Sequence, residues 1–291
     1  MKRKSVTAKR KSQFKKMEVS KMKIKELIKS LVPLFISLII TVISYFAAFA
    51  ITVIAGLTEV SNAEGASVNE GIFNLLRFTL MITFGGIWLY NISKIDTDEN
   101  HFIPSFSFKF KPLVYILLVI LGFSIQISTD SVLYIISKSA PDLFKSYHKM
   151  METFTGNISP LFLITVIILG PIAEEIIFRG LTMHYAEKIT GSLGVAIILQ
   201  GVLFGLYHGT IVQGIYATIF GIMLGVICVR SRSLFPSIFL HMIINGSLYL
   251  IPEKLFVNIP VAVTLIIFTV AVMITSLLLV LPRIQYTQSK K

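Results

Sequence analysis

This chain of 291 residues has few charged residues and a single cysteine. Only 14% of its residues are charged, against roughly a quarter in an ordinary soluble protein, whereas 54% are hydrophobic. The shortage of charge, together with a mean hydropathy of +0.79, excludes a soluble globular enzyme. Because Cys228 is the only cysteine, a disulfide framework, a cysteine zinc site and an iron–sulfur cluster are excluded as well.

The apolar residues fall into long runs separated by short polar joints, which predicts an all-α fold, a polytopic membrane helix bundle. A spanning helix needs about 20 residues, so the chain can hold about eight transmembrane helices. The first run, residues 31–57, is too long for the apolar part of a secretory signal. Pro112 and Pro260 stand where the first turn of a helix is expected. The expected helices cover residues 31–57, 72–92, 112–137, 160–188, 192–209, 211–229, 235–251 and 260–282.

Positive charge is concentrated at the N-terminus, where 12 of the 27 Lys and Arg residues lie within residues 1–30. A basic segment before an apolar run is typical of the cytoplasmic side and is attracted to anionic lipid, so no nucleic-acid partner is expected. With this segment inside, the expected helices place 22 of the 27 basic residues on the cytoplasmic side and 5 on the other. The sequence therefore predicts a multi-pass protein of the cell membrane with both termini in the cytoplasm.

Charged side chains inside spanning helices are costly and indicate functional sites. The segment GPIAEEIIFRG holds Glu174, Glu175 and Arg179. Glu175 and Arg179 are four residues apart and share a helix face, so an ion pair is expected. Glu174 points about 100° away from Glu175 and has no such partner in its own helix. An unpaired carboxylate among apolar groups suits a general base, whereas the structural alternative is an ion-pair network at a helix end.

Two further helices carry His208, in FGLYHG, and His241 and Asn245, in FLHMIIN. The helix that holds Glu174 descends about 21 Å to the next turn, and the following helix climbs back about 24 Å to His208. Glu174 and His208 therefore lie at similar depth. His241 lies about 10 Å from the turn at residues 230–232, and Asn245 is one turn further on the same face. We expect all four residues in one pocket entered from the cytoplasm, although each histidine alone is more typical of a helix-to-helix hydrogen bond.

The ordered patterns E-E-x-x-x-R, F-x-x-x-H and H-x-x-x-N resemble the CAAX protease and bacteriocin-processing (CPBP) family of intramembrane endopeptidases. The resemblance spans residues 160–250 and implies a protease that cuts a membrane-associated protein or peptide. Eukaryotic members trim prenylated CAAX tails, and bacterial members are linked to bacteriocin immunity and peptide processing. The residues that carry the patterns are Glu174, Glu175, Arg179, Phe204, His208, His241 and Asn245.

The resemblance also implies a role for each residue. Glu174 would activate water, His208 would hold the water and relay a proton, and His241 and Asn245 would stabilise the oxyanion. A metalloprotease is the alternative, because Glu174, His208 and His241 would supply three zinc ligands and leave a position for water. Neither H-E-x-x-H nor G-x-S-x-G occurs, and Cys228 stands in a helix without a motif, so a serine or cysteine nucleophile is not expected.

Four segments are expected. These are a basic cytoplasmic N-terminal segment (1–30), three transmembrane helices (31–158), a catalytic core (159–251), and a last transmembrane helix with a cytoplasmic tail (252–291). The alternative function is a non-proteolytic membrane scaffold or immunity protein of the same fold, and the absence of an inverted repeat disfavours a transporter. His101, His148 and His184 are interpreted as ordinary polar residues in loops or near a helix end.

Overall fold

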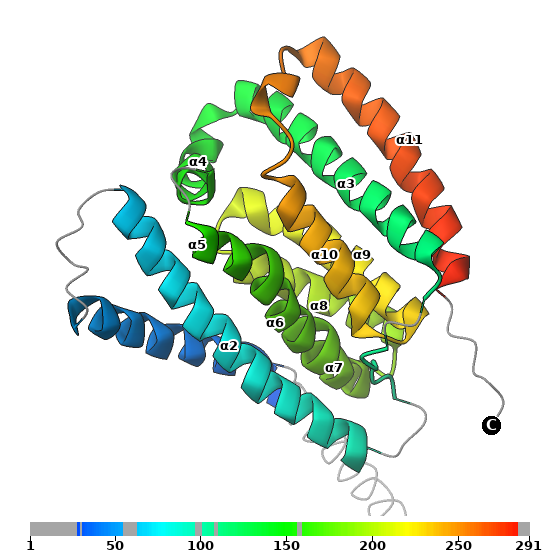
Figure 1. The fold of residues 1–291 in the computed structure, drawn as a ribbon. Helices are drawn as coiled ribbons and strands as arrows, with labels where there is room; N and C mark the ends of the chain where they lie inside the picture. Colours follow the sequence, from blue (N-terminus) through cyan, green and yellow to red (C-terminus); the bar gives the residue numbers. More distant parts are fainter. Residues whose placement is uncertain are drawn as a thin grey trace, which may run out of the picture.

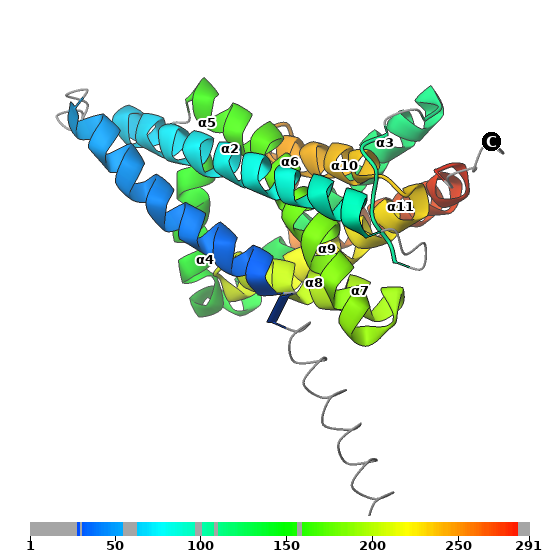
Figure 2. The same ribbon diagram turned by 90° about the horizontal axis from the view of Figure 1, so that it is seen from below.

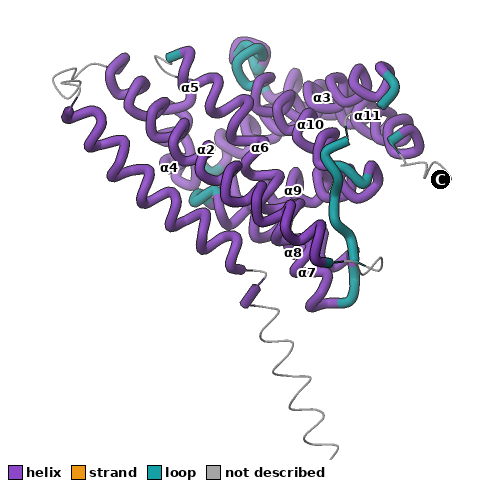
Figure 3. The backbone as a smooth tube through the Cα atoms, turned by 60° about the horizontal axis from the view of Figure 1, so that its bottom comes forward, coloured by secondary structure: helices purple, strands orange, loops and turns teal. Residues whose placement is uncertain are grey.

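The computed structural model describes residues 28–29, 31–54, 63–96, 101–107, 110–155 and 159–284. These residues form helices joined by short turns, and the described part of the chain holds no strand, only an isolated bridge between Ser105 and Ser233 (Figure 3). The predicted all-α membrane bundle is confirmed. Two of its apolar helices are short, Leu193–Tyr207 and Leu234–Ser247. Six are long enough to span a membrane: Leu31–Ile54, Asn69–Ile95, Pro112–Ser139, Pro160–Thr190, Ile211–Ser231 and Ile259–Arg283.

Two helix pairs flank the segments that carry the sequence motifs (Figure 1). The helix over Leu31–Ile54 and α2 (Ala63–Ile95) lie on one side, and α3 (Pro112–Ser139) and α11 (Ile259–Arg283) lie on the other (Figures 1 and 2). Many large apolar side chains of the outer helices are exposed, as lipid-facing surfaces require. The central elements are α5 (Pro160–Ile164), α6 (Gly170–Glu175), α7 (Met183–Thr190), α8 (Leu193–Tyr207), α9 (Ile211–Ser231) and α10 (Leu234–Ser247).

Residues 160–190 form one continuous rod, but it is not a regular α-helix. Two π-helical turns, η2 (Thr165–Leu169) and η3 (Ile176–Thr182), lie on either side of α6, which holds both glutamates. Pro171 explains the first turn, because its ring would crowd the carbonyl four residues earlier and it has no N–H to donate. Wider π turns at this place therefore change which side chains share a face of the rod.

The ends of the central helices follow from local sequence. Ser159, Ser192, Thr210, Ser233 and Asn258 each cap a helix by accepting a hydrogen bond from a backbone N–H two or three residues later. Proline follows Ser159 directly and occupies the first turn of α3 and α11, as expected. Because these signals are local, the observed ends of α9 and α11 lie within two residues of the predicted ones.

One helix was not predicted. α4 (Pro141–Thr155) occupies the stretch that was expected to be a plain connection between two spans. It is amphipathic, and its buried Phe144 and Tyr147 pack against Val212 at the start of α9. With 15 residues of mixed polarity, α4 gives no long apolar run, so a search for spans could not find it.

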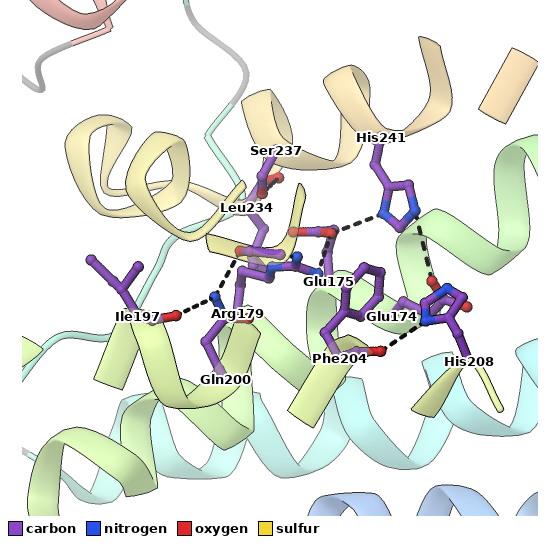
Figure 4. Close-up of polar contacts among 11 residues, drawn as sticks. Glu174, Glu175, Arg179, Ile197, Gln200, Phe204, His208, Leu234, Ser237 and His241 are labelled. Atoms are coloured by element: carbon purple, nitrogen blue, oxygen red, sulfur yellow. Dashed lines mark hydrogen bonds and ion pairs between the residues drawn. The ribbon is translucent and has the colours of Figure 1, made fainter. Parts of the chain in front are cut away.

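Glycines let α8 and α9 approach closely. A Cβ atom at Gly221 would lie 2.9 Å from the Cα atom of Gly201, and one at Gly205 would clash with the carbonyl oxygen of Gly214. Small residues at these crossings allow backbone contact that any larger side chain would prevent. This contact places the C-terminal end of α8, with Phe204 and His208, beside the glutamates of α6 (Figure 4).

Candidate active site

A cavity of about 360 Å³ lies inside the bundle, and it is lined by residues of α2, α3, α4, α6, α8, α9 and α10. Glu174, Phe204, His208, His241 and Asn245 all line it, although they come from three separate helical segments. Figure 4 shows Glu174 and His208 facing each other below His241. The structure therefore brings the four candidate catalytic residues to one space.

The cavity extends away from the side on which an entrance was expected. Ser105 N–H donates to Arg232 O, so the connection between α2 and α3 and the turn between α9 and α10 lie together at one end of the bundle. The lining includes no residue of that turn, and the side from which a substrate enters stays a prediction. Helix rise fixed the depth of the four residues but not where neighbouring helices leave space. The walls come from the opposite halves of the helices, including residues 74–78 of α2, 126–133 of α3, 166–174 and 241–248.

Glu175 and Arg179 form the expected ion pair, and both side chains are fully buried. Arg179 Nη1 donates to Glu175 Oε1 at 2.7 Å, and Nη2 donates to Gly221 O at 3.2 Å. The guanidinium also lies 4.4 Å from the ring centre of Phe204, and Gln200 donates to the same Gly221 carbonyl at 2.7 Å. One arginine thus connects the rod to α8 and α9, beneath the cavity.

His241 lies between the two glutamates. Its Nδ1 is 2.9 Å from Glu175 Oε1, and its Nε2 is 3.7 Å from Glu174 Oε2. Because the carboxylate of Glu175 is an acceptor, Nδ1–H is the donor, and Nε2 is the atom that remains to face Glu174. Sequence spacing could not indicate this contact, since it depends on how closely α10 approaches α6.

His208 is oriented by the backbone of its own helix. Its Nδ1 lies 2.7 Å from Phe204 O, and a carbonyl can only accept, so the hydrogen stands on Nδ1. In the neutral ring, Nε2 is then an acceptor. His208 can therefore hold a water O–H or take a proton, as expected of a residue that assists a base.

Asn245 has a partner that the sequence did not reveal. Its Nδ2 donates to Val166 O in η2 at 3.1 Å. In this π turn the carbonyl of Thr165 is paired with Gly170 N–H, so the next carbonyl would need the N–H of Pro171, which does not exist. Asn245 satisfies the orphaned carbonyl and keeps one amide N–H for a ligand.

The zinc hypothesis does not fit the arrangement of side chains. Among the residues that the structure describes, no group of three or more His, Cys, Asp or Glu side chains is placed to hold a metal ion. Glu174, His208 and His241 share the cavity without forming such a group.

Residues 156–247 match the family described as Type II CAAX prenyl endopeptidase Rce1-like. This segment is a domain of the CAAX protease family. It runs from just before α5 to the end of α10 and contains every motif residue. No curated protein and no solved structure matched the chain. Together with the six spanning helices, the family match identifies the chain as a multi-pass membrane protein.

Polar residues outside the CAAX-protease domain also line the cavity. Asn74 and Arg77 come from α2, and Gln126 and Asp130, which are hydrogen-bonded at 2.9 Å, come from α3. The signal that could have found these residues is a polar or charged side chain within an apolar span.

His184 is a buried residue that holds two segments of the chain together, rather than an exposed one. Its side chain is buried, Nδ1 lies 3.3 Å from Phe102 O, and Nε2 lies 3.3 Å from Asp96 Oδ2. The backbone N–H of Phe102 donates to Glu187 at 2.8 Å. These contacts fasten the connection between α2 and α3 to α7, at the end of the bundle remote from the cavity.

Proposed function

We propose that this protein is an intramembrane endopeptidase that hydrolyses a peptide bond in a membrane-associated protein or peptide. The observation that carries the proposal is the convergence of Glu174, His208, His241 and Asn245 on one cavity within an apolar bundle. The match to CAAX endopeptidases supports the same reaction class and favours a CAAX-type tail or a processed peptide as substrate.

Glu174 and His208 would activate the water. Glu174 accepts one proton of the water, and Nε2 of His208 accepts a hydrogen bond from its other O–H. The water oxygen then attacks the carbonyl carbon of the peptide. Both acceptors line the cavity, so a water between them would present its lone pair to the substrate.

His241 and Asn245 would stabilise the oxyanion. Asn245 has one amide N–H left after its bond to Val166 O. Donation from Nε2 of His241 needs a second proton on the ring. With His241 protonated, the two glutamate carboxylates balance the charges of His241 and Arg179. The C–N bond then breaks, and the proton held by Glu174 passes to the departing amine.

The test is hydrolysis of candidate peptides by purified protein, with the products identified by mass spectrometry. Glu174→Gln keeps the shape but removes the proton acceptor, so we expect the rate to fall by about a hundredfold or more. Glu152→Gln, at an exposed glutamate of α4, is the matched control and should cut like the wild type. Near-wild-type cleavage by Glu174→Gln would refute Glu174 as the base. Absence of cleavage by the wild type would favour the non-proteolytic scaffold or immunity protein.

We also propose a cell-membrane location with both termini in the cytoplasm and a basic N-terminal segment that contacts anionic lipid. Of that segment, residues 1–27 and 30 lie outside the described residues. The proposal is supported by the concentration of Lys and Arg at the N-terminus.

A further inference from the structure

Two polar side chains of α2 face the cavity without a partner. Asn74 and Arg77 both line it, and they share a helix face because they are three residues apart. Asn74 is only 6% exposed. Within the described residues, neither side chain forms a hydrogen bond or an ion pair, and Arg77 Nε is shielded from solvent without an acceptor.

Aromatic rings hold the guanidinium of Arg77 in place. It lies 4.2 Å from the ring centre of Phe78 and 5.3 Å from that of Phe73. Contact with the rings positions the guanidinium but satisfies none of its N–H donors, which point outward in the plane of the guanidinium. Arg77 is half-buried, and a cation without an ion pair in a spanning helix is costly, so the arrangement favours an anionic ligand.

Arg77 lies close to the proposed base along the cavity wall. Its neighbour Phe78 packs against Gly170, where a Cβ atom would be 3.1 Å from Phe78 Cζ. Gly170 precedes Glu174 by four residues, about 6 Å along the rod. The hydroxyl of Tyr207 lies within electrostatic range of both Arg77 and Glu174, so the two charged groups are on the same side of the cavity.

The other acidic groups near Arg77 leave room for a ligand. Glu70 is two turns earlier on α2 and interacts with Arg77 only at electrostatic range. Asp130 belongs to α3 and already accepts a hydrogen bond from Gln126. Neither carboxylate forms an ion pair with the guanidinium among the described residues. The fork of donors on Arg77, with the amide of Asn74 beside it, matches the two oxygens of a carboxylate.

We propose that Asn74 and Arg77 bind the terminal carboxylate of the peptide substrate. The inference rests on the proposed function, and it adds a specificity site outside the CAAX-protease domain. The site therefore selects peptides with a free carboxyl end over peptides whose end is blocked.

The test compares two forms of one probe, a peptide that ends in a prenylated Cys-Val-Ile-Met tail, with a free carboxylate or a C-terminal amide. The full chain is placed in discs of zwitterionic phosphatidylcholine, and kcat/KM is measured for both forms. We expect the wild type to prefer the free acid by about tenfold or more. Arg77→Gln should cut the two forms with equal kcat/KM, and Arg77→Lys should keep part of the preference for the acid. Arg230→Gln, at an exposed arginine far from the cavity, should behave like the wild type.

Equal cutting of both forms by the wild type, or an unchanged preference in Arg77→Gln, would overturn the proposal. If the probe is not cut at all, the same pair is compared by thermal-shift binding. Preference for the acid that disappears in Arg77→Gln would then support the carboxylate site while the proposed hydrolysis fails. Binding without preference would overturn the site as well. In a last arm, anionic phosphatidylglycerol is added to the discs. If this lipid abolishes the wild-type preference for the acid, Arg77 binds lipid phosphate and the proposal fails.

Discussion

Glu175 serves two partners with one oxygen. Its Oε1 accepts from Arg179 at 2.7 Å and lies 2.9 Å from Nδ1 of His241. The position of His241 in the cavity therefore depends on an arginine that does not line the cavity. Arg179 is a positioning residue in this arrangement. Its loss would lower the stability of the fold and disturb the position of His241 in the site.

Replacing Arg179 should destabilise the protein strongly. Arg179→Ala leaves the fully buried Glu175 without its cation and removes one donor from Gly221 O, so a loss of about 3–5 kcal/mol is expected. Arg179→Lys keeps the charge but not the fork or the flat face over Phe204, and should be intermediate. Thermal unfolding in detergent measures both variants. Arg283→Ala, at the exposed end of α11, is the control, and equal melting temperatures for it and Arg179→Ala would contradict the prediction.

At this scale, the sequence predicted local contacts and missed distant ones. The pair of Glu175 and Arg179 is four residues apart in one helix, so spacing alone indicates it. The contacts of His241 with Glu175, and of Asn245 with Val166, join residues 66 and 79 positions apart. They depend on the packing of α10 against the rod, which periodicity does not encode.

At the scale of elements, the π turn η2 couples a proline to the candidate site. Pro171 deprives Val166 O of a backbone donor, and Asn245 supplies one at 3.1 Å. A regular helix over residues 160–188 was expected, because apolar length gives no indication of π turns. Proline inside the span was the available signal.

This coupling can be measured with a double-mutant cycle. Asn245→Ala leaves Val166 O without a donor and should cost about 1–3 kcal/mol of stability. In a Pro171→Ala background, an N–H is restored within the rod, so the cost should fall by about 1 kcal/mol. Thermal unfolding of the four proteins gives the coupling. Pro160→Ala, at a first turn where no bond is lost, is the control background, and simple additivity with Pro171→Ala would speak against the account.

α4 is the element whose contribution the sequence concealed. Its Tyr147, Met150 and Met151 line the cavity, although the helix lies outside the predicted spans. Burial raises the pKa of Tyr147 to about 12, so the phenol stays neutral across the working pH range and adds no charge to the wall. An amphipathic helix at the end of the bundle thus supplies one wall of the cavity, and the spanning helices supply the others.

For the whole molecule, the charge distribution and the cavity point to opposite faces. Basic residues are concentrated at the N-terminus and in the turns at the end of the bundle that holds Arg230 and Arg232. The cavity extends towards the end at which α4 lies. If the basic end is cytoplasmic, α4 and the cavity face the outside of the membrane.

Labelling of single cysteines tests this topology. Cys228 is buried, so the background should be low. A membrane-impermeant maleimide added to intact cells should label Lys145→Cys, at an exposed site of α4, and should label Arg230→Cys only after permeabilisation. The reverse pattern would place the termini outside. Labelling of both positions in detergent is the control for reactivity.

The direction of the cavity has a pharmacological consequence. With the basic turns in the cytoplasm, a water-soluble inhibitor would reach Glu174 from outside the cell, past α4, without crossing the bilayer. A compound that carries a carboxylate for Arg77 and a tetrahedral group for His241 would be too polar to permeate, yet this site would not require it to do so. Efflux pumps and permeability barriers, which limit drugs against cytoplasmic proteases, would then offer no protection to this one.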